Sequence, residues 1–528
     1  MVSLTELPPE VLHNVLQYLD PSDLAFVPRV CQALHHAVRG NAMLFKHVYL
    51  AHFDKPARDK VNWEQNLKDL VRLQVVCHQS DINAKRSELA FVHDTVTEAL
   101  KNACVDGERA TSSTTYPYSR NAALLLELFS AHENQYAFLA RSFLYERARA
   151  ELPSAGTFAS PPKKEHQMSA KLHCLYGVPM LYAQRSPHET RQGKMSPFAC
   201  SKVYDIRQYT ARTRWGPFMD DGSDRVDWEK VEAILLVIGA NLKELGLNSF
   251  PICKNFWDTP FAGVWPRSYL ALPMDDEEVI EQSPLELQDP YGVTGTWLRV
   301  VCFLDYTDFF DFNFSVEQEQ PANIPRRAID YGEATRLILM RITVDRIEPP
   351  GPEDGQDLPV VHFKGVSRSL DDRWDENANS DLTGTVRLTP EGEVRWTTFS
   401  IFNGQERWRS ESVQLGGVKS AKGILGNWFD KDFDPRGPTG PTAFWKISER
   451  SSSGKNGNHG DLPYPGGVFT HNPNYDPDYD SSDDLDVGSE DDYDEDTEGD
   501  EGAEINIDVE FLIEGGIEVA DTPPSLRE

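Results

Sequence analysis

The 528-residue sequence predicts an α+β protein with a helical N-terminal part, a mainly antiparallel β domain that contains at least one helix, and an acidic disordered tail. Up to about residue 152, apolar residues recur with the spacing of amphipathic helices. Between residues 296 and 415, runs rich in Val, Ile, Thr, Trp and Phe alternate with turn residues, which is typical of hairpin-connected strands. Residues 476–504 then carry sixteen carboxylates and no Lys or Arg, so charge repulsion opposes folding there.

Residues 4–53 predict four short helices. The first helix begins near Pro9, because proline suits the first helical position. Asp20 is placed to cap a second helix that starts at Pro21. The apolar face of the first helix consists of Val11, Leu12, Val15, Leu16 and Leu19. The later stripes consist of Leu24, Val27, Val30, Cys31, Leu34 and Val38, and then of Leu44, Phe45, Val48, Tyr49 and Phe53.

A sequence pattern in this region is more specific than helical spacing. It runs Leu7-Pro8-Pro9-Glu10-Val11-Leu12, Val15-Leu16, Tyr18-Leu19, Asp23-Leu24, then Val30-Cys31 and Leu34, and it resembles the F-box. Gln32 and Leu34 depart from the commonest form, which has a basic residue and Trp at these positions. The resemblance implies binding to a Skp1-type adaptor and, through it, to the cullin and RING subunits of a ubiquitin ligase. The residues it implies in adaptor binding are Leu7, Pro8, Glu10, Val11, Leu12, Val15, Leu16, Leu19, Leu24, Val30, Cys31 and Leu34.

The size of this apolar stripe supports the same interpretation. Three short helices cannot bury so many apolar side chains among themselves, so part of the stripe needs a partner. The alternative is an ordinary helical hairpin that packs on the chain's own next helices.

We expect five segments along the chain. Helices are predicted over Trp63–Cys104 and Asn121–Glu151, and the break at Pro153–Pro162 marks a boundary. The segments are an F-box at 1–54, a helical linker region at 55–152, a mainly β substrate-binding domain at 165–450, a Gly/Pro-rich and then acidic disordered segment at 451–504, and a C-terminal strand and tail at 505–528.

The β domain is predicted to be barrel-like. Its strands are expected at Thr296–Leu304, Phe309–Phe314, Arg336–Ile347, Val360–Val366, Leu382–Leu388, Val394–Phe402 and Arg407–Leu415. Lys202–Tyr209 also has a β pattern, Asp227–Leu242 predicts a helix, and Pro435–Gly467 is expected to be irregular. Consecutive hairpin-connected strands favour a closed barrel, because closure removes exposed edges. A sandwich is the alternative.

Two further resemblances concern this domain. Gly295-Thr296-Trp297 is similar to the Gly-x-Trp motif of lipocalin-type (calycin-like) barrels, in which the Trp closes one end of the barrel. A Trp packed in any β core is the alternative. Patches resembling large fungal F-box proteins are Val203–Arg207, Arg225–Glu232, Val413–Asp430 and Gly440–Lys446.

Composition and motif searches exclude several function classes. The net charge of −32 opposes nucleic-acid binding, and no apolar run is long enough to span a bilayer. Seven cysteines without a CxxC pair argue against a disulfide framework and a thiolate metal site, so we expect a cytoplasmic or nuclear protein. GxSxG, HExxH and GxGxxG motifs are absent, and we expect neither catalysis nor a cofactor. The acidic loop at 371–381 could hold Ca²⁺, but its spacing departs from that of an EF-hand and favours a solvated loop.

These observations predict a non-catalytic substrate receptor of an SCF-type ubiquitin ligase. The alternative is a small-ligand-binding or enzymatic barrel whose F-box serves its own turnover. The polar loops at 349–359 and 371–381 are candidates for specificity, and Arg373 and Trp374 are the predicted anchors for an unknown protein substrate. Ser481 and Ser489 each precede an acidic residue by three positions, which makes them candidate phosphorylation sites.

Overall fold

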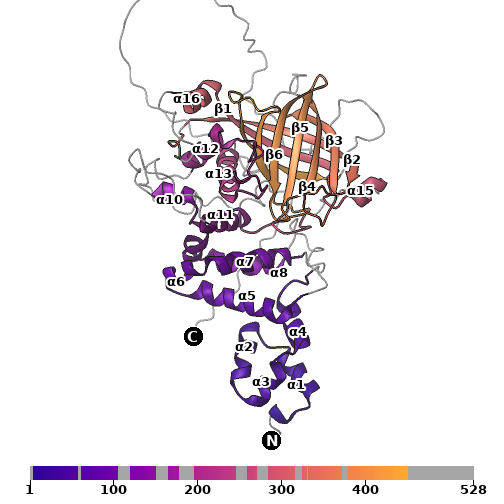
Figure 1. Ribbon diagram of the computed structural model, residues 1–528. Coiled ribbons are helices and arrows are strands. Elements are labelled where there is room, and N and C mark those ends of the chain that lie inside the picture. The colour runs from indigo at the N-terminus through magenta and orange to yellow at the C-terminus, as the bar shows by residue number, and fades with distance from the viewer. Residues whose placement is uncertain are drawn as a thin grey trace, which may run out of the picture. The chain divides into compact units, whose positions relative to one another are not determined.

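The computed structural model of the protein describes residues 4–56, 61–104, 119–149, 164–177, 196–244, 259–269, 283–315, 324–329, 331–370 and 379–449. The chain divides into two units, Met1–Pro463 and Tyr464–Glu528. All the described residues belong to the first unit, in which N-terminal helices precede a β-barrel (Figure 1).

The N-terminal helices are η1 (Leu4–Glu6), α1 (Pro9–Leu16), α2 (Pro21–Phe26), η2 (Val27–Arg29), α3 (Gln32–Val38) and α4 (Ala42–His52). Pro9 and Pro21 begin their helices as predicted. Asp20 occupies the N-cap position of α2, but its side chain makes no capping hydrogen bond, so that part of the prediction is wrong. A side-chain cap is found on α4, where Oδ1 of Asn41 accepts from the amide of Leu44 at 3.1 Å.

The next helices are shorter than the two predicted ones. They are α5 (Trp63–His78), α6 (Ile82–Ser87), α7 (Leu89–Lys101), α8 (Arg120–Ser130), α9 (His132–Asn134), the π-helix η3 (Gln135–Leu139) and α10 (Phe143–Arg149). Asp81 starts α6 by accepting from the amide of Asn83 at 2.8 Å. Within the second predicted helix, Gln135 turns inward and donates to the carbonyl of Phe129 at 2.8 Å. These local hydrogen bonds interrupt the two predicted helices, although the apolar spacing continues across the interruptions.

Three further helices follow this region in the sequence: α11 (Lys164–Tyr176), α12 (Ser196–Tyr204) and α13 (Trp228–Glu244). The helix predicted at Asp227–Leu242 is therefore confirmed. The strand predicted at Lys202–Tyr209 is wrong, because α12 and the 3-10 helix η6 (Ile206–Gln208) occupy it. Asp205 accepts from the amide of Arg207 at 3.2 Å and starts η6, a local bond that the alternating pattern conceals.

The β domain is a closed antiparallel barrel of eight strands, so the sandwich alternative is wrong. Its strands are β1 (Gly295–Leu304), β2 (Glu333–Glu348), β3 (Val360–Ser369), β4 (Asn379–Leu388), β5 (Val394–Phe402), β6 (Gln405–Gln414), β7 (Ile424–Asp430) and β8 (Gly440–Ser448). Each strand pairs with the next, and β8 closes the barrel on β1 with Leu298 opposite Trp445. β8 lies in a stretch that was expected to be irregular.

Phe309–Phe314, predicted as a strand, belongs to helix α16 (Tyr306–Phe314). Asp305 caps this helix by accepting from the amide of Thr307 at 2.8 Å. Phe309 and Phe312 then lie three residues apart on its buried face. The short helix α15 (Pro284–Gln288) precedes β1 and has a capping box in which Ser283 and Glu286 bond to each other's amides.

The barrel interior is a packed apolar core. Trp297 and Trp396 meet edge to face with ring centroids 5.2 Å apart, and both rings contact Phe444. The indole of Trp297 donates to the carbonyl of Val293 at 3.0 Å, which fixes the ring near the start of β1. This place fits both the lipocalin-type motif and an ordinary β core, so the first remains a prediction.

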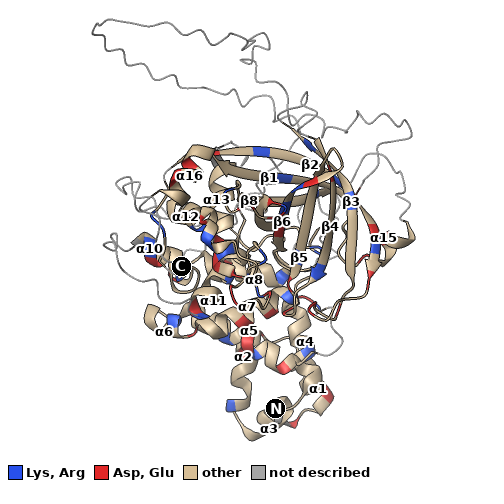
Figure 2. Ribbon diagram, turned by 45° about the horizontal axis from the view of Figure 1, so that its top comes forward, with Lys and Arg blue, Asp and Glu red and all other residues tan. Residues whose placement is uncertain are grey.

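The outer wall of the barrel is covered by helix. α13 packs on β1, β7 and β8, and it also contacts α11 and α12 (Figures 1 and 2). α11 in turn contacts α7 of the helical region. A continuous set of packed elements therefore joins the helices around α7 to the barrel.

The barrel connections lie at two opposite ends. The 349–359 loop follows β2 at the end where β1 begins, whereas β3 and β4 meet at the other end, with Arg368 opposite Asn379. Most of the second predicted specificity loop, residues 371–378, lies outside the described residues.

Candidate functional site

The apolar residues of the first helix divide into two stripes. Leu12 and Leu16 point inward and are buried, and Leu19 packs partly buried against the same core. Leu24 and Leu34 are buried from α2 and α3. These five predicted residues form the core that holds the helices together. A partner would therefore contact the other predicted residues, which are exposed or half-buried.

The second stripe faces solvent. Val11, Val15 and Tyr18 follow i, i+4, i+7 spacing and are all exposed, so they form one outward face of α1 and the turn after it. Phe26 and Val30 add two exposed side chains from α2 and the turn after η2. Such a group of exposed apolar side chains is typical of a protein interaction site.

The remaining predicted residues border this stripe. Pro8, Glu10 and Cys31 are exposed, and Leu7 is half-buried. Tyr18 belongs to the F-box pattern in the sequence but was not among the residues predicted to bind the adaptor, although its i+7 position relative to Val11 was a usable signal. Sequence reasoning missed Phe26 and Leu4, which are also exposed. We call the exposed set of Val11, Val15, Tyr18, Phe26 and Val30 the apolar stripe.

A polar cluster fixes the back of this region. His13 on α1 and His47 on α4 lie within hydrogen-bond distance, with 3.1 Å between Nε2 and Nδ1. The Asn41 amide lies 3.4 Å from the other ring nitrogen of His13. One ring nitrogen donates and the other accepts, so the pair links α1 to α4.

A family model described as F-box-like matches residues 4–51. Residues 4–51 are an F-box-like domain. No curated protein and no solved structure matches the chain. The F-box-like domain implies binding of a Skp1-type adaptor, and it suggests an adaptor role in an SCF ubiquitin ligase; proteins with such a domain are typically non-catalytic substrate receptors. The fungal resemblance remains a prediction.

Several predicted site residues cannot be placed. Arg373, Trp374, Ser481 and Ser489 lie outside the described residues, as does nearly all of the acidic 371–381 loop. In the described part of the chain, no group of three or more His, Cys, Asp or Glu side chains could hold a metal ion. Across the same ranges, no helix is both long enough and apolar enough to cross a membrane.

A cavity of about 860 Å³ lies outside the F-box-like domain, at the barrel end where β1 begins. Its wall includes the aromatic residues Tyr269, Tyr291 and Trp297 and the cations Arg267 and Lys419. The segments that supply these side chains are far apart in the sequence, so no local pattern predicted the site.

A second cavity, of about 290 Å³, lies among α10, α12 and α13. Burial lowers the pKa of Lys230 to about 7, although its ammonium donates to the carbonyls of Lys202 at 2.7 Å and Val203 at 3.2 Å. Burial opposes ionisation of Asp205, but hydrogen bonds and charge from Arg207 and Arg326 lower its pKa. The charged groups here bind one another, which is typical of a structural network.

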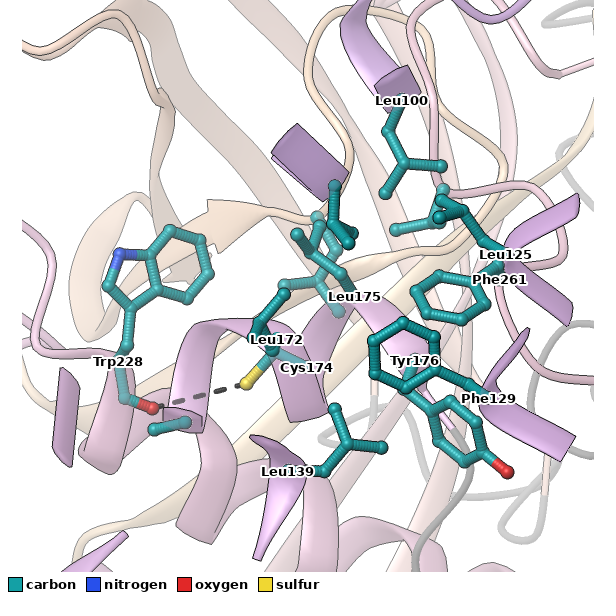
Figure 3. Packing of buried hydrophobic residues seen from close by; sticks show 14 of the residues in the cluster. Leu100, Leu125, Phe129, Leu139, Leu172, Cys174, Leu175, Tyr176, Trp228 and Phe261 are labelled. Carbon is teal, nitrogen blue, oxygen red and sulfur yellow. Dashed lines mark hydrogen bonds between the residues drawn. The ribbon is translucent and has the colours of Figure 1, made fainter. Parts of the chain in front are cut away.

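Cys174 on α11 is buried near the charges of Glu232, Lys171 and Asp227, and it could be taken for a nucleophile. It lies in the apolar packing of α11, where its thiol donates to the carbonyl of Trp228 at 3.9 Å (Figure 3). Burial raises the pKa of this thiol well above its ordinary value. The reactive thiolate is therefore disfavoured, and Cys174 acts as a core residue.

Proposed function

We propose that this protein is the substrate-recognition subunit of an SCF-type (Skp1-cullin-F-box) E3 ubiquitin ligase. The F-box-like domain binds a Skp1-type adaptor and, through it, the cullin and RING subunits. The observation that carries the proposal is the apolar stripe, which the chain's own helices leave exposed although the residues behind it are buried. The protein itself contributes proximity between target and transferred ubiquitin.

The proposed division of labour follows the predicted segments. Residues 1–54 dock on the ligase, residues 55–152 space the docking site from the rest, and residues 165–450 bind the target protein. The packing of α11 on α7 and of α13 on the barrel supports a stiff connection between these segments. A stiff spacer holds a bound target at a set distance from the ligase, which favours transfer to a nearby lysine.

Paired substitution Leu7→Ala, Pro8→Ala is expected to abolish adaptor binding. These residues open the F-box pattern directly before α1, and we propose that they are anchors of the interface; truncating such an anchor costs about 2 kcal/mol or more. Calorimetric titration of the full chain with a purified Skp1-type adaptor measures the loss. Wild-type affinity in the double variant would contradict the assignment.

A matched pair of valines sharpens this test. Val30 in the stripe is 71% exposed and Val75 on α5 is 57% exposed, so Asp is tolerated by the fold at both positions. Val30→Asp should remove adaptor binding because it places a charge in a desolvated interface, whereas Val75→Asp should leave it unchanged. Equal affinities of the two variants would place the adaptor elsewhere.

Target recognition is proposed at the end of the barrel that carries the 371–378 connection. Arg373 and Trp374 supply the two anchor types that interfaces favour, and the surrounding carboxylates favour basic targets. The double variant Arg373→Ala, Trp374→Ala should bind the adaptor normally and lose selected copurifying proteins. Capture should weaken with salt, since exposed charges are screened beyond about 8 Å at physiological ionic strength. An unchanged set of proteins at low and high salt would show that recognition lies in another segment.

The second candidate function is a ligand-binding barrel whose F-box controls its own turnover. The cavity at the barrel end favours ligand binding. Copurification separates the two functions, because a receptor brings down target proteins together with the adaptor and cullin. A barrel that is only degraded through its F-box brings down the adaptor without targets.

A further inference from the structure

The cavity at the barrel end is distinct from the barrel interior. Inside the barrel the rings of Trp297, Trp396 and Phe444 pack against one another, and Trp297 also borders the cavity. The cavity lies instead between the strand ends and the 266–269 and 286–294 segments. Its volume of about 860 Å³ falls in the range of small-molecule sites, roughly 300–1,000 Å³.

Two cations in its wall have an unusual backbone. Arg267 has φ 61° and Lys419 has φ 57°, both in the left-handed region that favours glycine. Backbone bonds hold them there, since the amide of Arg267 donates to the carbonyl of Val418 at 2.8 Å and that of Tyr269 donates to Lys419 at 3.1 Å. The same loop uses Gly416 and Gly417 at its other left-handed positions. Glycine adopts this backbone conformation at a lower energetic cost than other residues. A long cationic side chain at both positions therefore indicates that the side chain has a function.

The carboxylates of the cavity wall are all occupied. Asp289 accepts from the amides of Tyr291 at 2.8 Å and Val293 at 2.6 Å. Glu286 accepts from the amide of Ser283 at 2.6 Å. Glu449 pairs with Lys446. The amide donors are neutral, so the charges of Glu286 and Asp289 remain, and Asp289 attracts Lys419. The wall nevertheless holds four cations, Lys101, Arg267, Lys419 and Lys446, against these three carboxylates, so its net charge is positive.

The cations Arg267 and Lys419 form no ion pair with any side chain in the described ranges. The stem of Lys419 lies against Gly292, where an added Cβ would meet its Cε at 2.9 Å. Close by, Lys446 is nearly buried and its ammonium lies 5.3 Å from the ring centre of Tyr269. The hydroxyl of Tyr269 is itself buried and finds no hydrogen-bond partner among the residues that the structure describes. Positive charge, an unused hydroxyl and aromatic surface therefore meet at one place.

We propose that this cavity binds a small organic anion, a carboxylate with an aromatic or aliphatic body. Arg267 and Lys419 hold the charge, and the apolar body lies against Tyr269 and Trp297. A polypeptide bound as an added strand does not fit, because the closed barrel offers no free strand edge here. The site is independent of the F-box-like domain, so its test is independent of adaptor binding.

Calorimetric titration of the full-length protein with 2-naphthoate and with the neutral 2-naphthylmethanol tests the proposal. The two probes share the aromatic body and differ in charge. Naphthoate should bind at least about tenfold more tightly, which corresponds to 1.4 kcal/mol. Lys419→Gln and Arg267→Gln should each reduce naphthoate affinity severalfold and leave the affinity for the alcohol unchanged. Lys364→Gln, which removes an exposed cation from the barrel wall, is the control and should change neither.

Glycine variants distinguish a ligand-binding role from a structural one. Lys419→Gly and Arg267→Gly relieve the left-handed backbone, so the Tm should not fall while naphthoate binding is lost. A lower Tm in both glycine variants would show that these cations serve the fold and would overturn the proposal. Equal affinity for the two probes, no binding of naphthoate, or full affinity in the Gln variants would also overturn it.

Discussion

Glu411→Ala is expected to destabilise the protein by about 3–5 kcal/mol, because it breaks a buried charge network on the outer wall of the barrel. The Glu411 side chain is fully buried on β6. Its carboxylate accepts from Arg395 Nε at 2.9 Å, from Arg409 Nε at 3.0 Å and from the Thr397 hydroxyl at 3.0 Å. Without it, two guanidinium groups that are mostly buried lose their main counter-charge. Unfolding in urea measures the change in free energy.

Glu406→Ala is the matched control on the same strand. Glu406 is exposed, so its removal should change the free energy of unfolding by no more than about 0.5 kcal/mol. Replacing Glu411, Arg395 and Arg409 together with apolar residues should recover part of the loss, because no uncompensated charge then remains. A loss below about 1 kcal/mol for Glu411→Ala would mean that water reaches the guanidinium groups.

Phe129→Ala is also expected to destabilise the protein by about 3–5 kcal/mol, because it opens a cavity where the helical region meets the segments next to the barrel. The Phe129 ring on α8 is fully buried and lies 5.4 Å from the ring of Phe261 and 6.1 Å from that of Phe138. Figure 3 shows Phe129, Tyr176 and Phe261 grouped together, and the amide of Phe261 donates to the carbonyl of Tyr176 at 3.0 Å. The substitution removes the α8 side chain that lies beside Tyr176 and Phe261.

Leu126→Ala on the same helix is the control for this prediction. Leu126 is 38% exposed, so its truncation should cost much less than that of Phe129. Both variants are compared by urea unfolding, in which the midpoint should fall for Phe129→Ala. If the slope of the unfolding free energy against urea concentration also changed, the helical region and the barrel would no longer unfold together. Equal losses for Phe129 and Leu126 would contradict the packing described here.

The helices of the F-box-like domain were predictable because their apolar spacing and two N1 prolines are local signals. Which apolar side chains face the core and which face solvent was not predictable. Leu12 and Val11 are neighbours on one apolar face, and only packing against α3 and α4 decides that the first is buried and the second exposed. A single-sequence reading of a wide apolar face cannot separate core from interface.

The six strands β1 to β6 were predicted from alternation and hairpin turns, whereas β7 and β8 were missed. β8 is buried on both faces, with Phe444 inside the barrel and Trp445 in the cluster that includes α13. Such a strand loses the alternation that marks a half-exposed one. β7 contains Gly426 and Asn427, residues depleted in strands. The cavity at the barrel end depends on segments from Lys101 to Glu449, and no local pattern could have revealed it.

The pairing of the first strand with the last has a consequence during synthesis. The barrel cannot close until β8, which ends at Ser448, has left the ribosome, whereas the F-box-like domain ends at residue 51. At about 5–20 residues per second, the 397 residues between these points take roughly 20–80 s to translate. The F-box-like domain is therefore synthesised long before the strands, which begin only at Gly295. Once β1 has been made, it keeps an unpaired edge until β8 arrives, and an unpaired edge favours pairing with other chains.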